Sequence, residues 1–118
     1  MSRIKSEFRN LGLSVLAVAA IATAAPARAE TAAQFEVTLK NDVFAPAEVK
    51  VPAGKAFTMK FVNQDAGAAE IEAKDLKVEK IVAGNSEIIV RVGAMKPGRY
   101  LFVNEYKEET VKGYVVVE

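Results

Sequence analysis

Hydrophobic and polar residues alternate with a period of two through most of the chain beyond residue 34. The alternation is clearest over the ranges 35–40, 57–61, 88–92, 100–103 and 114–117. A period of two places every second side chain on the same face of a β-strand, so each run predicts a half-buried strand. Turn-forming segments such as Pro52-Ala53-Gly54 and Lys96-Pro97-Gly98 separate the runs. The pattern predicts seven or eight short strands in an all-β sandwich or barrel.

The stretch 68–80 is the least regular part of the chain. Acidic side chains stand among its apolar residues, and these are Glu70, Glu72, Asp75 and Glu79. Because its hydrophobic pattern favours no single element, three alternatives stay open for it. They are a strand, a long loop and one helical turn.

The start of the chain has the three parts of a secretory signal peptide. Arg3, Lys5 and Arg9 make it basic, the range 11–25 carries no charge, and a small residue at Ala29 suits a signal peptidase. A membrane anchor is the alternative, but the uncharged run is about 15 residues long, whereas a spanning helix needs about 20. We therefore expect cleavage after Ala29 and a periplasmic protein.

These observations divide the chain into three parts. We expect a signal peptide over residues 1–29, a flexible lead over 30–34 and one folded domain over 35–118. Without the leader the chain is slightly acidic and shows no basic face, so nucleic acid is not an expected partner. After cleavage we do not expect the protein to span a membrane.

The composition excludes several kinds of chemistry, because the sequence contains no cysteine and no histidine. A thiol nucleophile, an imidazole base, a Ser-His-Asp triad and a zinc site built on Cys or His are therefore ruled out. The chain also offers no nucleophile–base pair and no glycine-rich phosphate loop. We do not expect an enzyme.

Four short motifs in a fixed order resemble the cupredoxin family. They are Phe44-Ala45-Pro46 with the following strand to Gly54, Asn63-Gln64-Asp65, Lys96-Pro97-Gly98 with its aromatic strand, and Lys112-Gly113 before the last strand. The resemblance covers nearly all of the expected domain. It implies a Greek-key β-sandwich, with an immunoglobulin-like sandwich as the alternative.

The resemblance also locates the copper ligands of the family, and here the chain departs from it. A blue-copper centre needs two imidazoles, one thiolate and a weak axial ligand. The corresponding positions lie near Ala69, at Asn104, near Lys107 and near Val111. None of these side chains replaces the missing donors, so no type-1 copper is expected.

A narrower resemblance links the chain to small exported cupredoxin-like proteins that accompany bacterial iron-permease systems. It rests on the segment Glu70-Ile71-Glu72 and on the acidic, aromatic run Asn104–Thr110. Many members of that subgroup have a histidine where this chain has Lys107. The resemblance implies a periplasmic or membrane protein partner, namely the iron permease system.

Carboxylates could bind a metal in place of the missing copper ligands. If the loops near Ala69 and Asn104 meet, their acidic residues come together, and oxygen donors suit iron or manganese. The candidates for metal ligands are Glu70, Glu72, Glu105 and Glu108, with Glu109 beside them. The alternative is a solvated acidic rim that keeps the domain soluble.

Three functional hypotheses follow. The first is a periplasmic accessory protein of metal (iron) uptake. The second is a metal-binding or redox protein with an atypical Glu, Tyr and Met site. We expect Met59 to pack in the core, however, and Met95 to close one end of the sandwich. The third is an interaction sandwich without a cofactor. The cofactor is unknown, and weak iron or copper binding stays open.

Overall fold

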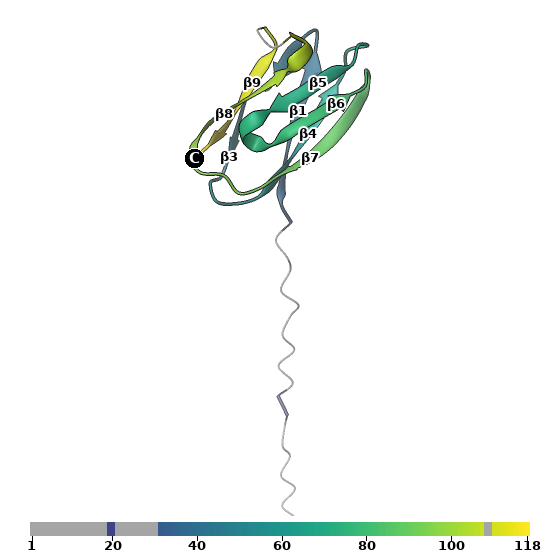
Figure 1. Ribbon diagram of the computed structural model, residues 1–118. Helices are drawn as coiled ribbons and strands as arrows, with labels where there is room; N and C mark the ends of the chain where they lie inside the picture. Colours follow the sequence, from purple (N-terminus) through teal and green to yellow (C-terminus); the bar gives the residue numbers. More distant parts are fainter. Residues whose placement is uncertain (1–18, 21–30, 108–109) are drawn as a thin grey trace, which may run out of the picture.

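The computed structural model describes residues 19–20, 31–107 and 110–118, and its folded part is a sandwich of two β-sheets (Figure 1). The predicted signal peptide lies almost wholly outside the described residues. Within them, no helix is both long enough and apolar enough to cross a bilayer.

Nine strands and two 3₁₀ turns make up the described domain. In chain order they are β1 (Ala33–Lys40), β2 (Val43–Ala45), β3 (Glu48–Val51), β4 (Phe57–Asn63), β5 (Ala69–Ala73), η1 (Lys74–Leu76), β6 (Val78–Val82), β7 (Ser86–Val92), β8 (Gly98–Asn104), η2 (Glu105–Lys107) and β9 (Lys112–Val117). The all-β sandwich is thus confirmed. The number of strands exceeds the predicted seven or eight because Pro46, which has no N–H to donate to a ladder, separates β2 from β3.

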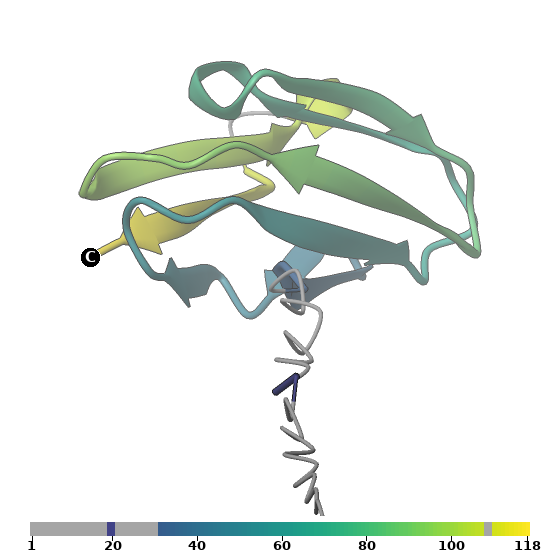
Figure 2. The same cartoon turned by 90° about the horizontal axis from the view of Figure 1, so that it is seen from below.

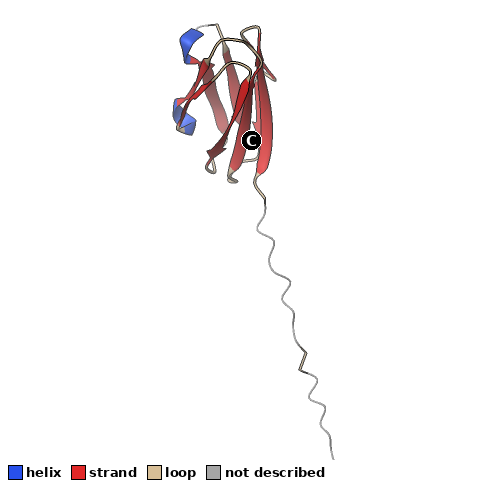
Figure 3. Ribbon diagram, turned by 90° about the vertical axis from the view of Figure 1, so that its right-hand side faces the viewer, coloured by secondary structure: helices blue, strands red, loops and turns tan. Residues whose placement is uncertain are grey.

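The strands form two layers (Figure 2). One sheet has the order β2-β1-β4-β7 and the other the order β3-β9-β8-β5-β6. Two pairs are parallel, β1 with β4 and β3 with β9, and the remaining pairs are antiparallel. Both 3₁₀ turns belong to connections of the five-stranded sheet (Figure 3).

The core lies between the two sheets, and the alternation in the sequence explains which side chains enter it. In β4 every second residue is buried, beginning with Phe57 and Met59. Three aromatic rings meet at the centre, where Phe102 is 0 % exposed and its ring centroid lies 5.0 Å from that of Phe44 and 5.5 Å from that of Phe61. The prediction that Met59 fills the core is confirmed.

Two sequence expectations are resolved by strand pairing. The irregular stretch 68–80 folds into a hairpin, in which β5 and β6 are joined by η1 and by Lys77 at a φ of 59°. Strand β1 begins within the range 30–34 that was expected to be a flexible lead, because Ala33 already pairs with Phe57 at the start of the parallel β1–β4 ladder.

Candidate functional site

The positions that correspond to the copper ligands of the cupredoxins lie at one end of the sandwich. Ala69, Asn104 and Lys107 line a common pocket of about 410 Å³ between the β1–β2 turn, the β4–β5 loop and η2. Val111 is buried behind them and is 2 % exposed. The structure therefore brings together the four positions that correspond to copper ligands, but none of them carries a thiolate or an imidazole.

Lys107 makes this end of the sandwich a poor place for copper. Its Nζ atom lies 2.6 Å from Oδ2 of Asp42 in an ion pair that joins η2 to the β1–β2 turn. An ammonium group has no lone pair to give a metal, and its charge repels a cation. The residues present do not fit a type-1 copper centre.

The Asn63-Gln64-Asp65 motif has a structural role beside the pocket. Asn63 is 2 % exposed, and its side-chain nitrogen donates to the carbonyl oxygen of Gly67 at 2.9 Å. The carboxylate of Asp65 accepts hydrogen bonds from the backbone N–H groups of Asn41 at 2.6 Å and Asp42 at 3.0 Å. These two bonds, the one from Asp42 first, lower the pKa of Asp65 below its ordinary value, because they stabilise the charged form.

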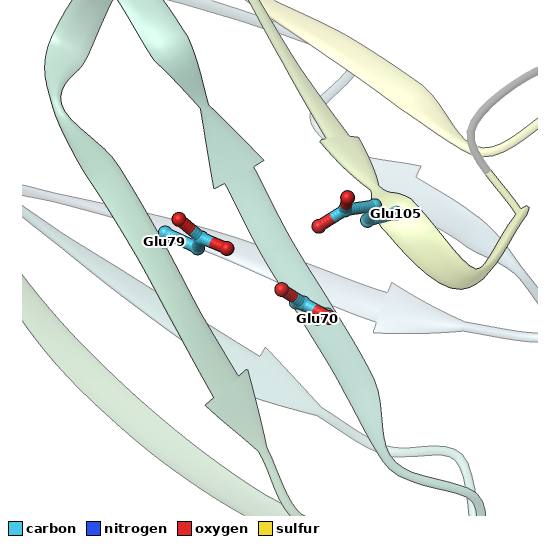
Figure 4. Close-up of side chains that lie close together, drawn as sticks. All are labelled: Glu70, Glu79 and Glu105. Carbon is cyan, nitrogen blue, oxygen red and sulfur yellow. The ribbon is translucent and has the colours of Figure 1, made fainter.

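A cluster of four carboxylates lies on the outer face of the five-stranded sheet. Glu70 and Glu72 point outward from β5, Glu79 is the partner of Glu72 on β6, and Glu105 begins η2. Carboxylate oxygens of Glu70, Glu79 and Glu105 all lie within 4.8 Å of one another. Figure 4 shows these three side chains directed toward a common point. We call Glu70, Glu72, Glu79 and Glu105 the carboxylate cluster.

Like charges shift the protonation of this cluster. The pKa of Glu105 is raised to about 7, first by a side-chain hydrogen bond with Glu72, then by one with Glu70, with partial desolvation and charge repulsion adding to both. Glu105 is exposed, so its carboxylate neighbours matter more than burial. Glu105 therefore keeps its proton up to about pH 7, and a bound cation would relieve the same repulsion.

The cluster contains three of the four residues predicted as metal ligands. Glu70, Glu72 and Glu105 come together, whereas Glu108 lies outside the described residues. Glu79 was not predicted, because its place beside Glu72 depends on the β5–β6 register. That register has no clear signal in the stretch 68–80. The ammonium group of Lys74 lies at the edge of the cluster, with its Nζ atom 3.7 Å from Oε1 of Glu72.

Among the methionine and tyrosine candidates, Met59, Met95 and Tyr100 lie away from the cluster, whereas Tyr106 directly follows Glu105 in η2. Met59 is enclosed in the core at 1 % exposure. Met95 packs against the core at the other end of the sandwich, where its carbonyl accepts from the N–H of Gly54. The hydroxyl of Tyr100 donates to the carbonyl of Lys96. These three residues do not join the carboxylate cluster.

Comparisons with known proteins agree with the fold. A family model described as a cupredoxin-like domain matches residues 13–117. An uncharacterized protein of Rickettsia prowazekii is 30 % identical over 84 residues, which is 71 % of this chain and 67 % of that protein.

Solved structures of low sequence identity share the fold. The metal-binding domain of the Cu(I)-exporting ATPase CopA of Streptococcus pneumoniae aligns with a TM-score of 0.62 and 17 % identity, over 72 % of this chain and 84 % of that domain. Auracyanin A of Chloroflexus aurantiacus, a "blue" copper protein, aligns with a TM-score of 0.61 and 18 % identity, over 75 % of this chain and all of the other. At such identities the likeness concerns the fold.

Proposed function

The chain belongs to the cupredoxin-like domain family but holds neither the thiolate nor the imidazoles of a blue-copper centre, and from these two facts we propose an accessory role in metal uptake. The protein acts in the periplasm, binds a divalent cation such as iron(II) through carboxylates, and passes it to, or docks on, a membrane iron permease. Its function is binding rather than catalysis.

The observation that carries this proposal is the convergence of carboxylate oxygens from β5, β6 and η2 within 4.8 Å. Iron(II) and manganese(II) accept carboxylate oxygens readily, whereas copper(I) prefers sulfur and imidazole donors. Copper bound by the structural neighbours gives no support for copper here, because that chemistry needs side chains that this chain lacks.

Export and the permease partner rest on the sequence. The basic start, uncharged run and small residues before Glu30 support delivery to the periplasm. The segments Glu70–Glu72 and Asn104–Thr110 support the partner, since they resemble exported proteins that accompany iron permeases. Co-purification of a permease with the tagged protein from membranes would support this partner, and normal iron uptake in a deletion strain would argue strongly against it.

Calorimetric titration tests the metal site directly. The protein carrying residues 30–118 is titrated with Fe(II), Mn(II), Cu(II) and Cu(I), alongside the double variant Glu70→Gln, Glu105→Gln. The matched control is Glu36→Gln, Glu87→Gln, which removes two exposed carboxylates from the outer face of the other sheet, where they flank Lys60. We expect saturable Fe(II) or Mn(II) binding that the first variant loses and the control keeps.

Two results would overturn the metal site. One is the absence of saturable binding by any of the four ions, and the other is equal loss of binding in the control variant. A cofactor-free interaction sandwich would then be the better hypothesis. It is favoured by the exposed isoleucines Ile81 (62 %) and Ile89 (59 %), which lie on the edge strands β6 and β7.

A further inference from the structure

Asn104 occupies an unusual place beside the carboxylate cluster. It ends β8, pairs with Ile71 of β5 and is only 3 % exposed. Among the described residues, it and Asn63 are the buried polar side chains. A buried amide is retained only where its hydrogen bonds are needed, since an apolar side chain would otherwise fill the same space at lower cost.

The side-chain oxygen of Asn104 joins the two segments that carry the cluster. It accepts one hydrogen bond from the backbone N–H of Glu70 at 3.1 Å and another from that of Tyr106 at 3.3 Å. Glu70 belongs to the cluster, and Tyr106 directly follows Glu105 in η2. One oxygen atom therefore fixes the distance between β5 and η2 at the point where their carboxylates approach.

The hydrogen bonds of Asn104 oppose an electrostatic repulsion between β5 and η2. Carboxylates within 4.8 Å of one another repel, and this repulsion pushes η2 away from β5. The turn is short and all three of its residues are exposed, so packing opposes the movement only weakly. A second tether, the Lys107–Asp42 ion pair, holds the far end of η2.

We infer that Asn104 is the positioning residue of the carboxylate cluster, holding Glu105 against Glu70 through their backbones without contacting the cation itself. This inference rests on the metal site proposed above. The position at which cupredoxins place a copper-binding thiolate has here become the support of an oxygen-donor site on the sheet face.

The test compares two buried asparagines. Asn104→Leu removes the bridge, and Asn63→Leu removes the hydrogen bonds of an equally buried amide, none of which reaches Glu70 or Tyr106. Mn(II) affinity is measured by calorimetry, and exchange of the Glu70 and Tyr106 amides is followed by NMR in the metal-free protein. We expect Asn104→Leu to weaken Mn(II) binding at least tenfold and to speed exchange of both amides, while Asn63→Leu changes affinity less than twofold.

Two further variants separate positioning from general destabilisation. Asn104→Asp retains the oxygen acceptor and should restore slow exchange at both amides. In a Glu105→Gln background, Asn104→Leu should have little further effect on affinity, since the residue acts through Glu105. If Asn104→Leu does not fold, Asn104→Ala and Asn63→Ala make the same comparison without the larger leucine side chain, and only Asn104→Ala should weaken Mn(II) binding.

The outcomes distinguish this inference from the proposed function. Unchanged Mn(II) affinity in Asn104→Leu, or equal losses in Asn104→Leu and Asn63→Leu, would overturn the positioning role. If the wild-type protein binds neither Mn(II) nor Fe(II), the proposed metal site is refuted. The role of Asn104 as a bridge between β5 and η2 is then decided by amide exchange alone, where unaltered exchange in Asn104→Leu would refute it.

Discussion

Replacing Gly113 by alanine should destabilise the protein, because the new methyl group has no room. A Cβ atom built at this position lies 2.6 Å from Cε2 of Phe102 and 3.0 Å from the carbonyl oxygen of Ala47. Real Cβ atoms do not approach other heavy atoms this closely, so either the ring or the β9 backbone has to move.

Neither group moves easily. The ring of Phe102 is 0 % exposed and packs edge-on against Phe44 and Phe61. The Ala47 carbonyl is fixed by the hydrogen bond that it accepts from the N–H of Tyr114 at 2.8 Å. Overpacking of a well-filled core costs about 1–3 kcal/mol. For a domain of this size each kcal/mol lowers Tm by about 4–8 °C, so a loss of about 2 kcal/mol corresponds to about 8–16 °C.

Thermal and urea unfolding followed by circular dichroism measure this loss. The matched control is Gly93→Ala, where nothing lies within 4 Å of the new Cβ, and its stability should stay within about 0.5 kcal/mol of wild type. Trimming the ring with Phe102→Leu should reduce the cost of Gly113→Ala by about 1 kcal/mol or more, since the two sites are in contact. A Gly113→Ala variant as stable as Gly93→Ala would refute the reasoning.

Three further predictions concern the polar groups. Asn63→Ala should lower the free energy of unfolding by about 2–4 kcal/mol, because buried carbonyl and amide groups lose their hydrogen-bond partner. Urea denaturation measures this loss, and a change below about 0.5 kcal/mol would contradict the structural role of Asn63. Asp65→Asn should destabilise the protein at pH 7. Because the pKa of Asp65 is lower in the folded protein than its ordinary value of 3.8, the stabilisation is complete above 3.8 and is lost as the pH falls further through the folded-state pKa, so the difference should shrink there; a pH-independent difference would count against it. The raised pKa of Glu105 changes stability with pH in the opposite direction, so the metal-free wild type should lose stability as the pH rises from 4.5 to about 7. Glu105→Gln should remove that loss, and parallel stability–pH profiles of the two proteins would be inconsistent with the raised pKa.

The fold was accessible from the sequence because a sandwich buries one face of each strand. The alternation at Phe57 and Met59 in β4 directly reports which side chains face the other sheet, and the structure confirms it. The stretch 68–80 gave no such signal, since Lys77 adopts a left-handed conformation and η1 interrupts the hairpin.

The candidate site was only partly accessible. The proximity of Glu70, Glu72 and Glu105 could be expected once the fold was inferred, but Glu79 depends on a cross-strand register that the sequence does not specify. Asn104 stands at the position where the cupredoxin resemblance places a thiolate. Its two backbone partners belong to segments that meet only after folding, so its hydrogen bonds could not be predicted.

The parallel pairing of β3 with β9 affects how the protein acquires its structure. β3 lies near the start of the domain and β9 is its last strand, so almost the whole domain must be synthesised before this pair can form. Pairing between distant segments is slow, because the intervening chain has to be ordered first. Until β9 arrives, the β3 backbone on that side has unsatisfied hydrogen-bonding groups and is open to pairing with other chains. Truncating the last strand should therefore make the protein prone to aggregation during its synthesis.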